Sequence, residues 1–71
     1  MIVLVFKTDI RNRKLVKTIA PHLEELPGVS RWTVDLWDAD KVLRIETNTL
    51  SAAVIEKSLG SLGFYCKELP D

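Results

Sequence analysis

The first six residues most limit the folds that are open to this chain. Met1 to Phe6 are all apolar, and Ile2, Val3 and Val5 among them are β-branched. A run that is apolar at every position suits a strand whose two faces are covered or nearly so, as in the interior of a sheet. The run therefore predicts a central strand, although it leaves open which face Phe6 takes.

A helix is predicted after the polar turn that follows this strand. Asn12 is a good N-cap, because its side-chain oxygen can accept from free backbone N–H groups of the first turn. Apolar residues then recur at spacings of three, four and three on one face: Val16, Ile19, Leu23 and Leu26. Pro21 falls inside this pattern, and an interior proline kinks a helix. We expect one bent helix, with a break after Thr18 as the alternative, and an end at Pro27-Gly28.

Two alternating segments joined by a polar turn predict a β-hairpin. Residues 30–37 place Trp32, Val34 and Leu36 on one face and Thr33, Asp35 and Trp37 on the other. Residues 38–41 form the turn, and residues 42–47 alternate again, with Leu43 and Ile45 inward. We expect the outward Arg44 and Glu46 to make cross-strand charge pairs near Asp35 and Thr33.

The last third of the chain predicts a second helix and a short strand. Ser51 is the expected N-cap of a helix over residues 52–62, and Gly63 is its expected stop. The expected apolar face comprises Val54, Ile55, Leu59 and Leu62. A final strand over residues 64–69 ends at Pro70.

The order strand, helix, strand, strand, helix, strand fixes the fold class. Each strand–helix–strand unit crosses over right-handed, so both helices cover the same face of one sheet. The sequence therefore predicts an α+β, ferredoxin-like βαββαβ sandwich with a four-stranded antiparallel sheet and two helices on one face. Residues 1–71 form one domain, because the chain is too short for a second.

Composition excludes several classes of partner and linkage. Ten acidic and ten basic residues cancel, which argues against nucleic-acid or acidic-membrane binding. One cysteine, Cys66, allows no internal disulfide. The apolar run before Lys7 is too short for a signal peptide or a membrane span. We expect a soluble, cytoplasmic protein with no nucleic-acid and no membrane partner.

The chain resembles the heavy-metal-associated domains of copper chaperones and metal-transporting ATPases. The resemblance covers nearly the whole chain and is carried by the order of several segments: residues 6–10 (FKTDI), 26–29 (LPGV), 32–35 (WTVD), 40–46 (DKVLRIE) and 63–64 (GF). Such domains bind a soft metal through a Met-x-Cys-x-x-Cys loop before the first helix. An ungapped count places Ile10 on the methionine and Asn12 and Leu15 on the two cysteines. Both thiolates that Cu(I) selects are therefore absent.

The loop that stands where the metal loop would be is the first candidate site. Its residues are Ile10, Arg11, Asn12, Arg13, Lys14 and Leu15. Basic side chains beside free helix N–H groups suit an anion or an acidic partner surface. A solvated loop with no ligand is the plainer alternative.

Trp37 is the second candidate, as an interface residue together with Asp35 and Thr33. It points away from the expected core, on a strand that should lie at the sheet edge, where association between proteins is common. Local packing under the hairpin is the plainer alternative. Exposed aromatics also stack bases in RNA-recognition modules, but those modules use the two central strands.

Cys66 and His22 are the residues left for a metal. Strand alternation places Cys66 on the face of Phe64, toward the helices, where a cysteine acts as a small hydrophobe. His22 has no ligand partner three or four residues away.

No catalytic residues and no cofactor are expected. The sequence has no paired carboxylates, no nucleophile with a nearby base and no glycine-rich phosphate loop. It predicts a non-enzymatic interaction or regulatory module with a degenerate metal loop, which docks a partner protein or forms a homodimer. The alternative is residual copper or zinc binding or transport, using Cys66 and His22 or a partner chain.

Overall fold

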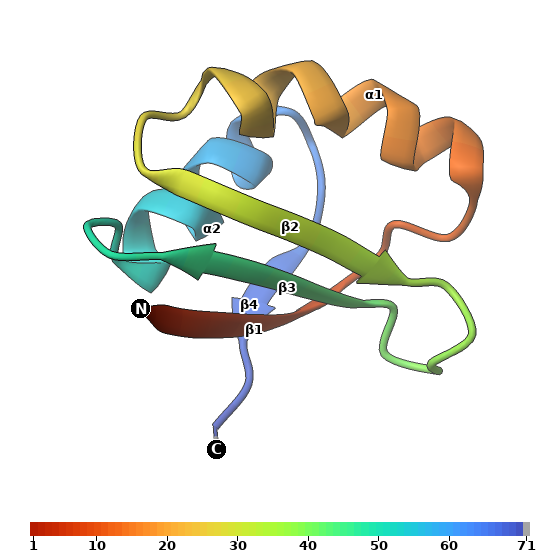
Figure 1. The fold of residues 1–71 in the computed structure, drawn as a ribbon. Coiled ribbons are helices and arrows are strands. Elements are labelled where there is room, and N and C mark those ends of the chain that lie inside the picture. The colour runs from red at the N-terminus through yellow and green to blue at the C-terminus, as the bar shows by residue number, and fades with distance from the viewer. Residues whose placement is uncertain (71) are drawn as a thin grey trace.

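The computed structural model describes residues 1–70 as one layer of strands and one of helices (Figure 1). The elements follow the predicted order: β1 (Ile2–Thr8), α1 (Arg13–Glu25), β2 (Val29–Asp35), β3 (Val42–Thr47), α2 (Ala52–Ser61) and β4 (Cys66–Glu68). Neither helix of this described part is long and apolar enough for a membrane crossing.

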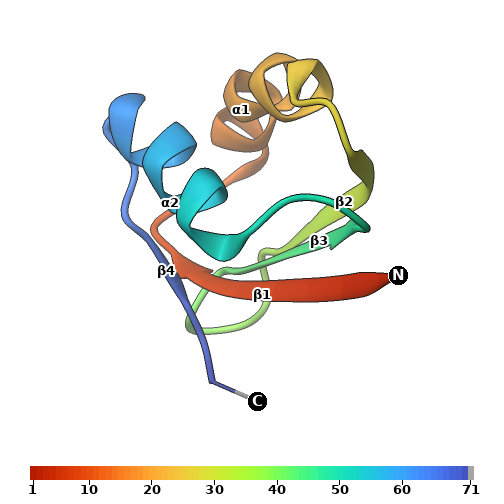
Figure 2. The same cartoon turned by 90° about the vertical axis from the view of Figure 1, so that its left-hand side faces the viewer.

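The four strands form one antiparallel sheet in the order β2-β3-β1-β4. Both helices lie on the same face of it, as the turned view makes clear (Figure 2). The expected ferredoxin-like sandwich is thus confirmed, with β1 in the interior of the sheet and β2 at one edge.

The core lies between the sheet and the helices. It is made of fully buried apolar side chains from both layers: Phe6, Ile10, Ile19, Leu23, Leu43, Ile45, Ile55 and Leu59. Phe6 therefore faces the helices, which settles the point that the apolar run left open. Burying a side chain of this size contributes about 1.5–3 kcal/mol.

α1 begins and ends largely as the sequence predicts. Asn12 is its N-cap, and its Oδ1 accepts from the backbone N–H of Leu15 at 2.9 Å. The helix continues through Pro21, so the alternative of two helices is wrong. Pro21 is exposed, so its ring lies outside the core. After the helix, Gly28 takes a φ of 99°, a backbone conformation that is strained for any residue with a side chain.

β2 is shorter than expected, and this moves Trp37. The strand ends at Asp35, whose Oδ1 accepts from the backbone N–H of Trp37 at 3.0 Å. Lys41 Nζ donates to the carbonyl of Leu36 at 2.7 Å. These local bonds divert the backbone from the ladder. Trp37 therefore lies in the β2–β3 loop, and its predicted place on an edge strand is wrong.

The expected cross-strand charge pairs do not form. Arg44 pairs in register with Thr33, while Asp35 lies opposite the apolar Val42. Glu46 pairs in register with Arg31 and not with Thr33. Within residues 1–70 the one ion pair is between Lys7 Nζ and Asp40 Oδ1, at 3.5 Å.

The second half confirms the helix cap and corrects two details. Ser51 Oγ accepts from the N–H of Val54 at 3.4 Å, as an N-cap should. Val54 itself is 42% exposed and so lies off the apolar face. β4 begins only at Cys66, because the N–H of Phe64 donates to Leu59 and that of Tyr65 donates to Asp9 instead of to β1.

Candidate functional site

Three loops meet at one end of the sheet, and we call this the loop end: residues 9–12, 36–41 and 63–65. β1 and β2 both finish here, beside the start of β3. Thr8 N–H donates to the carbonyl of Asp40 at 3.0 Å, which joins the first two loops. Tyr65 N–H donates to Asp9 Oδ1 at 3.0 Å, which joins the first and third. The three segments therefore form one surface.

Two of the predicted contact residues belong to the core. Ile10 is fully buried, and Leu15 packs against the core cluster. Thr8 holds the loop in this inward position, since its Oγ1 donates to the carbonyl of Lys41 at 2.6 Å and accepts from the N–H of Ile10 at 3.2 Å. Hydrophobic burial thus removes Ile10 and most of Leu15 from any contact surface.

The basic side chains of this loop are exposed and form no ion pair with any residue that the structure describes. Arg11, Arg13 and Lys14 lie in solvent, and none of them takes part in the single ion pair of residues 1–70. Asn12 between them is engaged in capping the helix. The first turn of α1 contains no acidic residue either. The start of α1 therefore carries basic side chains that form no ion pair within residues 1–70.

The acidic residues of the loop end are already engaged. Asp9, Asp35 and Asp38 each accept a backbone N–H, from Tyr65, Trp37 and Asp40 respectively. Asp40 pairs with Lys7. These carboxylates therefore shape the loops, while the basic side chains remain available.

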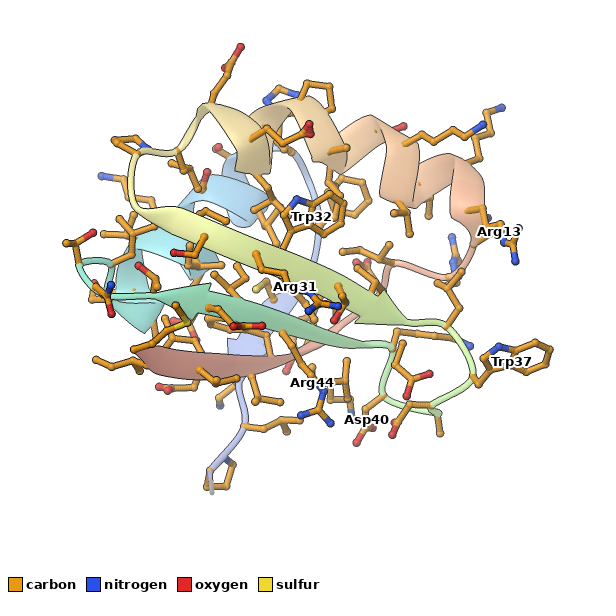
Figure 3. The ribbon with its side chains drawn as sticks, viewed as in Figure 1. Arg13, Arg31, Trp32, Trp37, Asp40 and Arg44 are labelled. Atoms are coloured by element: carbon orange, nitrogen blue, oxygen red, sulfur yellow. The ribbon has the colours of Figure 1, made fainter. Side chains whose placement is uncertain are left out.

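Trp37 is 97% exposed at the same end. Figure 3 shows its ring projecting outward from the β2–β3 loop, at the end of the molecule where Arg13 also lies. Of the other two predicted interface residues, Asp35 accepts from the backbone N–H of Trp37, and Thr33 is exposed on the sheet face away from the helices. The structure thus brings Trp37 together with the basic loop and not with Thr33.

Tyr65 is a loop-end residue that the sequence reasoning missed. Its side chain is half exposed beside the bond that joins the first and third loops. The available signal was its place between Phe64 and Cys66, both expected to face inward. The alternation of a strand turns such a residue outward.

Cys66 and His22 lie in different surroundings in the fold. Cys66 lies opposite Thr8 and packs against the core. Burial, together with the nearby carboxylates of Glu56 and Asp9, raises the pKa of its thiol to about 12. His22 is exposed on α1. No group of three His, Cys, Asp or Glu side chains in the described part of the chain could hold a metal ion.

Comparison with known proteins concerns the fold. No protein-family model and no curated protein matches the sequence. One similar structure is the yeast copper transporter domain Ccc2a, solved in apo and Cu(I)-loaded states. The match covers 97% of this chain and 96% of that domain, with 20% identity and a TM-score of 0.81. The match to the Cu(I)-loaded first domain of the human copper chaperone CCS covers 93% of this chain and 89% of that domain, with 21% identity and a TM-score of 0.77. The chain has the heavy-metal-associated fold.

A third structure of this fold is a complex. The chain matched in the Atx1–Cu(I)–Ccc2a assembly is 21% identical, with a TM-score of 0.80 and coverage of 97% of this chain and 96% of that one. In the present example of the heavy-metal-associated fold, Asn12 caps α1 and Leu15, in the first turn of that helix, contacts the core.

Proposed function

We propose that this chain is a non-enzymatic interaction domain that has the heavy-metal-associated fold without a thiolate loop, and that it docks an acidic partner protein through the loop end. The observation that carries the proposal is the almost complete exposure of Trp37 at the end that also presents Arg11, Arg13 and Lys14. The Atx1–Cu(I)–Ccc2a complex supports it, because a domain of this fold assembles there with a protein partner.

The chemistry of these side chains favours a protein surface as the ligand. Trp and Arg are the residues most enriched among those that dominate binding energy at interfaces, since they combine large apolar area with directed polar groups. The exposed Arg11, Arg13 and Lys14 would attract an acidic surface and raise the rate of encounter. The engaged carboxylates hold the loops in place before binding, which lowers the entropic cost of docking.

The test compares binding by variants that leave the core intact. The partner would be captured with the immobilised chain, purified, and titrated calorimetrically. We expect Trp37→Ser to raise the dissociation constant of the complex with the partner about 30-fold, which corresponds to the loss of one dominant interface residue. Arg13→Glu should also weaken binding and reduce its dependence on salt.

Val54→Ser is the matched control, because Val54 is an exposed apolar residue on α2 and outside the loop end. It should leave the dissociation constant unchanged. Equal binding by the wild-type and Trp37→Ser proteins would refute the loop end as the docking surface.

Residual metal binding is the competing function. Its weakness is the raised pKa of Cys66, because the soft-metal ligand is the thiolate and that form is disfavoured here. A titration of the reduced protein with Cu(I) and Zn(II) against a competing chelator should show no uptake. An Asn12→Cys/Leu15→Cys double variant is the positive control, since it places two thiols at the N-cap and in the first turn of α1. Tight uptake by the wild type that Cys66→Ser abolishes would replace the proposed function with metal binding.

A further inference from the structure

β1 is paired along only half of its outer edge. β4 pairs with Phe6, Lys7 and Thr8, and the last backbone bond on that side runs from Leu69 N–H to the carbonyl of Val5 at 2.8 Å. No strand in residues 1–70 pairs with Ile2 to Leu4 on the side away from β3. Figure 2 shows β1 continuing past β4 toward the N-terminus with no other strand along this edge.

The register shows which backbone groups face this open edge. In an antiparallel ladder, residues two apart direct their N–H and C=O groups to the same side. The carbonyl of Val5 points toward β4. The N–H and C=O of Val3 therefore point the same way, beyond the reach of β4, while Ile2 and Leu4 bond with β3. Val3 thus offers one donor and one acceptor to an added strand.

The side chains around this edge are apolar and uncharged. Met1, Ile2 and Val3 are exposed by 73%, 53% and 52%. Proteins usually protect sheet edges with charges, prolines or bulges, because an unprotected edge pairs with other chains. The opposite edge, β2, has such protection: Arg31, Asp35 and a register shift. The open part of β1 has no charged side chain from Met1 to Phe6.

We propose that this open edge of β1 is a self-association site, at which a second copy of the chain adds its own β1 in antiparallel orientation. With a two-fold axis beside Val3, the N–H of Val3 in each copy donates to the C=O of Val3 in the other copy. An antiparallel edge is complementary to itself in this way, which makes the contact isologous and closed. The new pairing is limited to Ile2–Leu4 of each copy, because Leu69 already bonds to Val5, and it joins the two sheets into one of eight strands.

A second copy is a suitable partner for this edge because neither copy brings a charged side chain to it. Each copy presents the same uncharged, largely β-branched residues, so no like charges meet across the pair. This site lies at the end of β1 opposite to the loop end. It is therefore independent of the proposed docking function, and the two can fail separately. Association through the second strand stays a separate prediction, although Arg31, Asp35 and the register shift protect that edge.

Sedimentation velocity over a hundredfold range of concentration tests the proposal. We expect the wild-type chain to form dimers as concentration rises. Val3→Lys should raise the dissociation constant of the dimer by about tenfold or more, because it places like charges across the two-fold axis. Thr33→Lys, an equal change on exposed β2, should leave the dimer unchanged. A wild-type chain that is monomeric throughout, or an equal loss in both variants, would overturn the proposal.

A second variant isolates the backbone bond. Val3→Pro removes the N–H that faces the open edge, and β1 keeps its bonds to β3 through Ile2 and Leu4. It should abolish the dimer while circular dichroism still shows the folded spectrum. Hydrogen exchange at the Val3 amide of the wild type should slow as concentration rises. A monomer with a protected Val3 amide would show that another segment covers the edge, and would also overturn the proposal. Trp37→Ser should not change self-association.

Discussion

Asn12 shows how one side chain decides what the loop before α1 can do. Its amide oxygen is committed to the N–H of Leu15, and the following basic residues are left in solvent. The cap satisfies one of the backbone donors that a helix start leaves free. The local role of Asn12 is therefore to stabilise α1, and any contact with a partner falls to its basic neighbours.

Replacing Asn12 should measurably destabilise the fold. We expect Asn12→Ala to lower the free energy of unfolding by about 1 kcal/mol, because the cap bond is lost. That change corresponds to a fall of roughly 4–8 °C in Tm for a domain of this size. Thermal and urea unfolding would measure it. Asn12→Asp keeps an acceptor at the same place and should keep full stability; an equal loss in both variants would contradict the capping role.

Cys66 should react slowly with alkylating agents. Its pKa of about 12 leaves the thiol protonated near neutral pH, and the thiolate is the nucleophile. We expect the rate of iodoacetamide modification at pH 8 to be about a hundredfold or more below that of an unfolded control peptide. Glu56→Gln should raise the rate, because one carboxylate that opposes ionisation is removed. A rate equal to that of the peptide would contradict the raised pKa.

The same pKa shift makes the free energy of unfolding depend on pH. The unfolded chain loses the Cys66 proton above its ordinary pKa of 9, whereas the folded chain keeps it until about 12. Stability should therefore fall as pH rises from 9 to 12. A Cys66→Ala variant should lose this part of the alkaline decline, which urea unfolding at several pH values would measure.

At the scale of elements, the two helices contrast in what they require of a glycine. The chain leaves α1 through Gly28 at a φ of 99°, where an added Cβ would also collide with the Thr49 side chain. Gly60 in α2 differs, because it has no such φ and its Cβ would meet nothing within 4 Å. Only the first of these glycines is required by the fold.

The two glycines should respond oppositely to alanine. Gly28→Ala should lower the free energy of unfolding by about 1 kcal/mol or more, through backbone strain and the clash with Thr49. Gly60→Ala should raise it by up to about 1 kcal/mol, because alanine loses less entropy in a helix. Urea unfolding of both variants would measure this. A destabilised Gly60→Ala protein would contradict the open space beside that position.

At the scale of the whole molecule, β3 is the strand that joins the parts. It pairs with β1 on one side and β2 on the other, and Leu43 and Ile45 are fully buried beneath the helices. β4 pairs over only three residues. Stability should therefore be highest in β3 and decline toward both edges of the sheet.

Native-state hydrogen exchange should show this order. We expect the amides of Leu43 to Ile45 to be the most protected, because opening them needs loss of the whole core. The amides of β4 should exchange faster, through local opening of a short edge strand. The measurement is exchange followed by NMR at low protein concentration, where β1 is unpaired at its open edge. Equal protection in β3 and β4 would contradict this distribution.

The candidate surfaces were only partly predictable from the sequence. The basic loop and Trp37 could be named as separate candidates, because charge and hydrophobicity are properties of single residues. Their meeting at one end depends on pairing between Phe6 and Leu43 and on the bond from Thr8 to Asp40, which join residues more than thirty positions apart. Ile10 was misassigned because an apolar loop residue does not reveal its burial.

What the sequence by itself determined was the order and type of the elements, the caps at Asn12 and Ser51, and the ferredoxin-like sandwich, since periodicity and capping are local. Tertiary structure alone decided the inward face of Phe6, the end of β2 before Trp37 and the short reach of β4. Each depends on hydrogen bonds or packing between distant segments, such as the one from Tyr65 to Asp9 that delays β4. The open edge of β1 is therefore a property of the folded molecule, because its cause lies at the other end of the chain.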